Sequence, residues 1–266
     1  MIHTSILGAL LWLTSSMALH LWQPHGQATE ETKQETLAGA WKLASGTTPF
    51  ADIPAGATAI ALMQDGYFSV AYFSTAAPQF IGTYGGTYTA AAGKITQHFM
   101  YNTFDSAAVG TAQTLAYTLQ AGQLQTAGTQ KGTNWQQTWE LVATPDKSPS
   151  PLAGTWQITA RADAEGTLHP MQRGPRKTLK ILTGGRFQWI AFNTETKQFS
   201  GTGGGTYTTT NGKYTEHIDF FSRDPSRVGA TLAFDYAVED GKWVHSGHSS
   251  AGKPIKEVWE RGQPSH

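Results

Sequence analysis

One segment occurs twice in this chain, 119 residues apart. The copies at 79–89 and 198–208 read QFIGTYGGTYT and QFSGTGGGTYT. The offset holds without a gap when 64–128 is aligned with 183–247, and 23 of these 65 pairs are identical. An internal repeat of this length predicts two copies of one domain instead of a single larger domain.

Within each copy the apolar residues follow the two-residue period of a β-strand. Residues 67–73 and 186–192 are matching examples, and no segment beyond the N-terminal apolar run has a helical period. Asp65-Gly66 and Asn211-Gly212 are typical hairpin turns between such runs. Seven or eight short strands per copy predict an all-β fold, either an up-and-down barrel or a sandwich.

The shared Gly-Gly-Thr-Tyr motif contains Gly85 and Gly86 in the first copy and Gly204 and Gly205 in the second. No Gly-Lys-Ser/Thr follows it, so a phosphate-binding loop is not indicated. Glycine inside a strand marks a bend or a close backbone approach. We therefore expect these four glycines to be structural.

Composition limits the possible partners. The chain has 19 basic and 19 acidic residues and a formal net charge of zero, which does not indicate a nucleic-acid partner. It has no cysteine, which excludes a disulfide, a thiolate zinc site and a lipid on cysteine. We expect no cofactor.

The N-terminus carries an apolar run, 6–13, that is too short and interrupted to predict a transmembrane helix. Small residues at Ala18 and Ala28 offer two cleavage sites for a secretory signal. We expect a secreted or periplasmic protein that contacts the membrane only if this signal stays uncleaved. The expected organisation is a signal at 1–28, a polar lead-in at 29–36, a first barrel at 37–142, a Pro/Ser linker at 143–151 and a second barrel at 152–262.

Both copies open with Leu-x-Gly-x-Trp, at Gly39 and Trp41 and again at Gly154 and Trp156. This opening resembles that of lipocalin-like (calycin) barrels, and the whole chain resembles tandem bacterial secreted lipocalin-like proteins of unassigned activity. In that superfamily the tryptophan closes the barrel floor against an arginine of the last strand. The resemblance assigns this role to Arg261 in the second copy.

The resemblance also implies an open mouth, a small-molecule cavity and a long loop over each mouth. The loops would be 44–58 and 161–177, and the second contains the basic stretch 169–177. This stretch could attract an acidic ligand or simply be a solvated loop.

The copies differ in charge. The second copy carries Arg186, Trp189, Glu216, Asp219, Arg223, Arg227 and Asp235 where the first has Tyr67, Val70, Gln97, Met100, Phe104, Ala108 and Ala116. A polar site would therefore belong to the second copy, unless that copy only has the more exposed outer face. The candidate ligand-binding residues are Trp189, His217, Asp219, Arg223, Glu216, Tyr236 and His98.

Catalysis is weakly indicated, and we assign no catalytic residue. Strand alternation places His217 and Asp219 on one face, where they could orient a general base or form a cross-strand hydrogen bond. Glu216 with Asp219 or Asp235 is the only candidate carboxylate pair for glycoside cleavage. His245 and His248 should point to opposite faces, and we expect no metal site.

These features favour an exported all-β protein with two tandem barrels that binds a small apolar or amphipathic ligand without catalysis. Two alternatives remain open. One is an extracellular enzyme acting on a glycan or small metabolite through the second barrel, and the other is a cell-envelope interaction module. The sequence does not indicate an oligomeric state.

Overall fold

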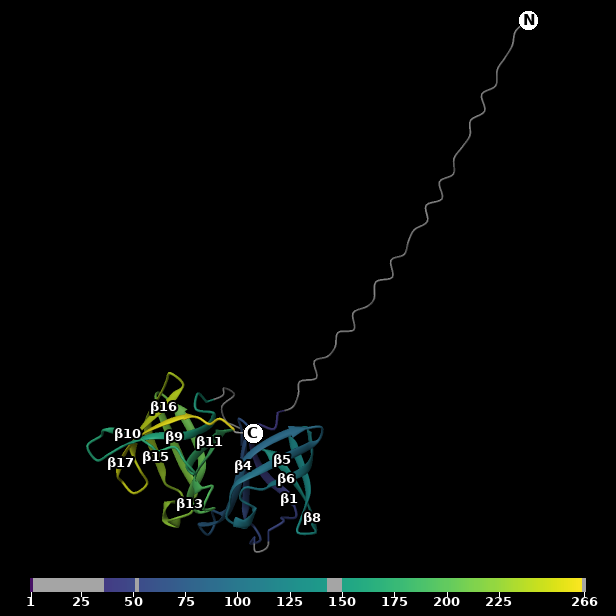
Figure 1. Ribbon diagram of the computed structural model, residues 1–266, viewed down its shortest axis with the longest axis horizontal. Helices are drawn as coiled ribbons and strands as arrows, with labels where there is room; N and C mark the ends of the chain where they lie inside the picture. The colour runs from purple at the N-terminus through teal and green to yellow at the C-terminus, as the bar shows by residue number, and fades with distance from the viewer. Residues whose placement is uncertain (2–35, 51–52, 143–149, 265–266) are drawn as a thin grey trace. The chain divides into compact units, whose positions relative to one another are not determined.

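Two closed antiparallel barrels make up the computed structural model (Figure 1). The structure describes residues 1, 36–50, 53–142 and 150–264. The expected signal, almost all of the lead-in and most of the linker lie outside these residues. From Thr36 onward the described residues belong to one compact unit. Among the described residues, no helix is long and apolar enough to cross a membrane.

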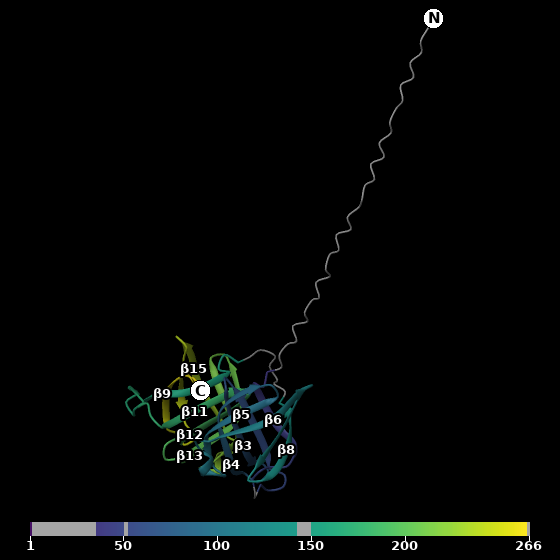
Figure 2. The same ribbon diagram turned by 45° about the vertical axis from the view of Figure 1, so that its right-hand side comes forward.

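Each barrel has eight strands that follow one another in sequence order around the cylinder (Figure 2). Barrel one consists of β1 Gly39–Gly46, β2 Thr58–Gln64, β3 Tyr67–Ser74, β4 Gln79–Ala91, β5 Lys94–Asn102, β6 Ala112–Gln120, β7 Gln123–Gln130 and β8 Thr133–Leu141. Barrel two consists of β9 Gly154–Ala162, β11 Arg176–Thr183, β12 Arg186–Asn193, β13 Phe199–Thr210, β14 Lys213–Phe221, β15 Thr231–Glu239, β16 Lys242–His248 and β17 Pro254–Arg261.

Three short elements complete the described fold. The 3₁₀-helices η1 (Ser106–Ala108) and η2 (Pro225–Arg227) occupy equivalent loops of the two barrels. Strand β10 (Leu168–Pro170) pairs with the end of β9 and lies within the loop 161–177.

First and last strands pair in both barrels, which closes the cylinders. Trp41 of β1 lies opposite Leu141 of β8, and Trp156 of β9 lies opposite Arg261 of β17. The expected fold of two tandem antiparallel up-and-down barrels is therefore confirmed, and its topology is lipocalin-like. A sandwich, the other architecture that the strand pattern allowed, does not form.

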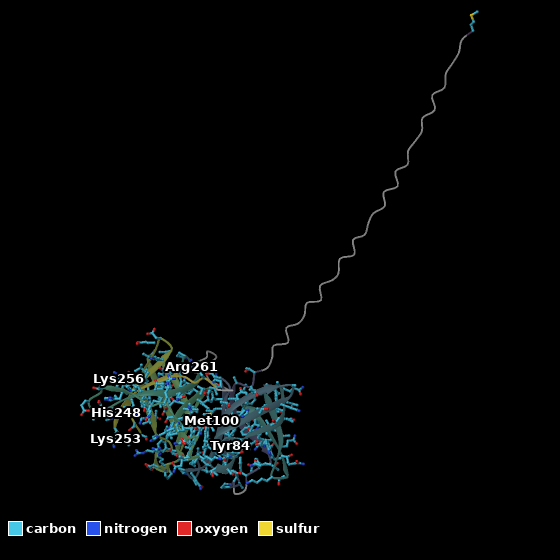
Figure 3. All side chains as sticks on the ribbon, viewed as in Figure 1. Tyr84, Met100, His248, Lys253, Lys256 and Arg261 are labelled. Atoms are coloured by element: carbon cyan, nitrogen blue, oxygen red, sulfur yellow. The ribbon has the colours of Figure 1, made fainter. Side chains whose placement is uncertain are left out.

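The opening tryptophan of each copy is buried in its own barrel, and its indole nitrogen donates a hydrogen bond to a backbone carbonyl four residues earlier. The distances are 3.0 Å from Trp41 to Leu37 and 2.9 Å from Trp156 to Leu152. The Arg261 guanidinium lies 3.9 Å from the Trp156 ring centroid, a cation–π contact. Arg261 is labelled in Figure 3.

The Gly-Gly motif forms a β-bulge in each barrel. Register shifts fall between Gly85 and Gly86 in β4, and at the equivalent pair in β13. A Cβ atom on Gly86 would lie 1.9 Å from the His98 carbonyl oxygen, and one on Gly205 would lie 1.9 Å from the His217 carbonyl oxygen. These strands bend where only glycine lets the neighbouring backbone approach so closely.

The two barrels contact each other through a pseudo-symmetric aromatic interface. Phe73 contacts Phe220 with ring centroids 4.7 Å apart, and Tyr101 contacts Phe192 at 5.0 Å. In the repeat alignment Phe73 is equivalent to Phe192, and Tyr101 to Phe220. The two contacts are therefore the same contact made in both directions, as in an isologous dimer interface.

Gln188 anchors the polar part of this interface. Its amide nitrogen donates to Thr83 at 3.1 Å and to Thr202 at 3.0 Å, and its amide oxygen accepts from the Ser69 hydroxyl at 2.5 Å. Ser69 and Gln188 are themselves equivalent positions, as are Thr83 and Thr202. The side chains of Ser69, Thr83, Gln188 and Thr202 thus satisfy one another across the interface, which avoids the penalty of leaving them unpaired.

We expect Gly205→Ala to lower the free energy of unfolding by at least about 1–3 kcal/mol, because the methyl group overlaps the β14 backbone. Urea denaturation provides the measurement. The matched control is Gly174→Ala, since a Cβ there meets no atom within 4 Å and the backbone is not left-handed. Equal stabilities of the two variants would contradict the bulge account.

Candidate functional site

Most of the residues that the sequence suggested for a polar site lie apart from one another in the structure. His217 and Asp219 both lie on the outer face of barrel two, but each has its own partner. His217 is exposed, with Nδ1 3.2 Å from the Thr231 hydroxyl, and Asp219 forms an ion pair with Arg186 at 2.8 Å. The hydrogen bond that the sequence allowed between His217 and Asp219 is therefore not among the contacts of the described residues.

Trp189 and Arg223 contact each other at one end of barrel two, which we call its upper end. The Trp189 ring contacts Phe221 with centroids 5.6 Å apart, and the Arg223 guanidinium lies 5.8 Å from the Trp189 ring. Arg223 also donates two hydrogen bonds to the Ser200 carbonyl, at 3.0 and 2.8 Å. The Trp189 indole occupies the space beside Gly203, where a Cβ would lie 2.7 Å from its Nε1.

The remaining candidates are dispersed. Tyr236 packs against the barrel two core, whereas His98 is exposed on barrel one, beside a surface depression of about 410 Å³. Glu216 is buried inside barrel two, and Asp235 is exposed outside it. Glu216 therefore shares no cleft with Asp235 or Asp219, and neither candidate carboxylate pair for glycoside cleavage forms.

Glu216 instead belongs to a buried ion pair. Lys180 Nζ lies 2.9 Å from Glu216 Oε1, which also accepts a hydrogen bond from the Tyr214 hydroxyl at 2.7 Å. The two charged side chains are 6% and 5% exposed. The Lys180 ammonium lies 5.2–6.0 Å from the ring centroids of Phe187, Tyr214, Trp243 and Trp259.

A second group of ionisable residues lies next to this pair, with His245 and Glu257 buried and the Arg161 side chain 55% exposed. The His245 Nδ1 atom lies 3.7 Å from Glu257 Oε2, and Arg161 binds Glu257 Oε1 at 2.6 Å. Burial, followed by the positive charges of Lys180 and Arg161, holds the pKa of His245 well below its usual value. His245 is therefore neutral at pH 7.

The sequence analysis did not predict most of this network, although a position-by-position comparison of the two copies shows it. Five inward positions of barrel two are ionisable where barrel one is neutral, as the strand registers show. The pairs are Gly46 and Arg161, Ala61 and Lys180, Gln97 and Glu216, Thr126 and His245, and Gln137 and Glu257. Only the Gln97–Glu216 pair was recognised from the sequence.

Barrel one has a pocket instead of charges at its mouth. We call this the mouth pocket; its volume is about 180 Å³, and its walls include Phe50, Tyr84, Phe99 and Trp135. Phe50, from the loop after β1, stacks on Phe104 with centroids 4.3 Å apart and contacts Tyr84 at 5.1 Å. A smaller interior cavity of about 40 Å³ also borders Tyr84 and Trp135 (Tyr84 is labelled in Figure 3).

Two residues that line the mouth pocket each contain a polar atom with no hydrogen-bond partner among the described residues. These atoms are the Gln113 amide nitrogen and the Trp135 indole nitrogen, and both are buried. At the rim, Asp105 and Lys131 form an ion pair at 3.0 Å, and the adjacent Lys131 ammonium lowers the pKa of Asp105. The pocket thus combines largely aromatic walls with an ion pair at its rim.

The low pKa of His245 predicts a pH dependence of stability. Below about pH 6.5 the unfolded state gains a proton that the folded state does not bind, so the free energy of unfolding falls by up to about 1.4 kcal/mol per pH unit. In His245→Thr, which copies barrel one, this component of the slope should be absent. Denaturant titrations between pH 7 and pH 5 measure it, and equal slopes in both proteins would contradict the assignment.

Comparisons with known proteins give no established activity. Residues 151–266 match the model of a domain of unknown function, DUF4488, and no curated protein matches the chain. Among solved structures, the chain is similar to a lipocalin-like protein from Bacteroides uniformis, with 14% identity over 42% of this chain and 100% of that one and a TM-score of 0.32. An uncharacterized protein from Saccharomyces cerevisiae shows 12% identity over 84% of this chain and 98% of that one, with a TM-score of 0.43.

Proposed function

We propose that this chain is an exported lipocalin-like protein that binds a small amphipathic molecule in the mouth pocket of barrel one, without catalysis. The observation that supports the proposal most directly is the pocket itself, whose walls include the rings of Phe50, Tyr84, Phe99 and Trp135. Ligand sites are mostly apolar concavities with a few polar groups that fix orientation.

The volume of the pocket limits the ligand. A cavity of about 150 Å³ accommodates benzene, so the mouth pocket of about 180 Å³ fits a molecule with one ring. The interior cavity of about 40 Å³ adds room for about one water molecule. A larger apolar ligand, such as a fatty acid filling the barrel, does not fit this conformation.

Barrel two supports the proposal as a partner domain. Its mid-barrel space is occupied by its own ion pairs and aromatic rings, and its upper end by Trp189 and Phe221. An eight-stranded barrel is just wide enough for its side chains to fill it or to hold one ligand. We infer that barrel one holds a ligand and that barrel two is filled by its own side chains. We also infer that barrel two stabilises barrel one through their shared interface.

The binding site is tested by NMR titration of the protein with a library of single-ring fragments. We expect shifts at the Trp135 indole and Phe50 signals, and loss of binding in Trp135→Ile. Ile255→Ala is the matched control, because Ile255 occupies the equivalent position in barrel two and should leave binding unchanged. The proposal fails if no fragment shifts these signals, or if Trp135→Ile binds fragments as tightly as the parent protein.

Export is proposed from the apolar run 6–13 and the small residues that follow it. Expression of the full chain with a C-terminal tag in a bacterial host, followed by fractionation and mass measurement, tests it. We expect a periplasmic or secreted product that begins after Ala18 or Ala28. A full-length product confined to the cytoplasm would contradict export while leaving the binding proposal intact.

A further inference from the structure

We propose that the groove beside His98 is a second binding site, which takes a small carboxylate with an apolar body. We call it the junction groove; residues 87–89, 98–100, 109–110, 177 and 194 line it, and its volume is about 410 Å³. Both barrels contribute to its walls. Ligand sites favour such junctions between domains, and their volumes are typically about 300–1,000 Å³. The inference goes beyond the proposed function, because it concerns a different site and a different class of ligand.

Barrel one supplies the apolar part of the groove. Alternation along β5 places His98 and Met100 on its outward face, and Val109 follows η1 in the neighbouring loop. Met100 is half-buried and is labelled in Figure 3. The loop is held against β5, because the Gly110 N–H donates to the Phe99 carbonyl at 2.9 Å. The groove therefore offers a ligand an apolar surface on a backbone that hydrogen bonds hold in place.

Barrel two supplies a positive charge. Lys177 lies near the start of β11 and is half-buried, and it takes part in no ion pair among the described residues. The loop beside it is tied down, since the backbone nitrogen and the hydroxyl of Thr194 both donate to the Pro175 carbonyl, at 3.0 and 3.3 Å. Lys177 is also the last residue of the basic stretch 169–177, for which the sequence left an acidic ligand open.

The charges around the groove favour an anion. Its lining contains no acidic residue, whereas Lys177 and protonated His98 are both positive. Burial, followed by the charge of Asp65, raises the pKa of the lining residue Tyr88 to about 12, so Tyr88 is neutral at pH 7. Asp65 itself lies 3.8 Å from Arg261, which offsets its charge. A carboxylate in the groove would therefore meet positive charge, and complementarity of this kind selects the sign of a ligand.

His98 differs from its equivalent in barrel two, His217. His217 lies opposite Thr231 of β15, and its Nδ1 atom is 3.2 Å from the Thr231 hydroxyl. The residue opposite His98 is Ala112, which has no hydroxyl, and the His98 ring makes no hydrogen bond among the described residues. A ring N–H of His98 can therefore be donated to a ligand carboxylate.

Two further positions of the groove differ in charge between the copies. Lys177 and Thr58 are equivalent in the strand registers, and Met100 and Asp219 are equivalent in the repeat alignment. Asp219 pairs with Arg186 at 2.8 Å, so the corresponding face of barrel two carries an anion together with its counter-charge. Of the two faces, the one with Met100 and Lys177 thus combines an apolar wall with a positive charge. The other copy supplies matched variants for the test.

The test is an NMR titration of the full chain with 2-naphthoate, an anionic two-ring probe, and with 2-naphthamide, its neutral counterpart. We expect 2-naphthoate to shift the His98 ring signals and to bind about threefold more tightly than 2-naphthamide, or better, because only the carboxylate is attracted by Lys177. Lys177→Thr, which copies barrel one, should remove most of this preference. His98→Ala should weaken 2-naphthoate binding, and the matched control His217→Ala should leave it unchanged.

The contradicting outcomes are specific. Equal binding of the two probes, unchanged 2-naphthoate binding in Lys177→Thr, or equal effects of His98→Ala and His217→Ala would overturn the inference. Shifts confined to Trp135 and Phe50 would place the probe in the mouth pocket, which overturns this second site and leaves the proposed function intact. Lys177→Met, which keeps the length of the side chain without its charge, is the second variant should thermal unfolding show that Lys177→Thr is destabilised, and it should lose the same preference.

Discussion

Closure of each strand cylinder is the constraint on which the rest of this structure depends. The first and last strands of each barrel pair to close it, and the longest strand bends at a bulge. At this bulge a Cβ on the second glycine would lie 1.9 Å from a carbonyl oxygen of the next strand. A closed cylinder has no free edge, and its inward side chains alone decide what it contains. Because the same glycine pair bends both copies, the inward positions could change without altering the fold.

The inward-facing residues of the two barrels differ in charge. In barrel two, five of these positions are ionisable, and Lys180 pairs with Glu216 while Arg161 pairs with Glu257. The Lys180–Glu216 pair is buried, and such pairs contribute little net stability because desolvation offsets their attraction, although removing one partner is costly. Barrel one has neutral residues at the equivalent positions and a pocket at its mouth, with Phe50 and Trp135 in its walls.

The sequence predicted the architecture better than the site, for physical reasons. Repeat length, strand period, Gly-x-Trp and the glycine pair all describe the backbone, and the fold follows from them. Alternation showed that His217 and Glu216 lie on opposite faces, but it did not show which face points inward. The mouth pocket depends on a loop residue, Phe50, and on a space beside Tyr84, and neither has a periodic signal. Lys180 lies just before the first residue of the ungapped alignment, so the alignment did not compare it with the neutral Ala61 of barrel one.

The central claim is that the two barrels diverged into one that holds a ligand and one that is filled by its own side chains. A crystal structure of the protein soaked with toluene, a single-ring probe, tests it most directly. The account predicts the ring in the mouth pocket, among Phe50, Tyr84 and Trp135, and no probe inside barrel two. A probe bound among Lys180, Trp243 and Trp259, or a mouth pocket that stays empty at saturating concentration, would contradict it.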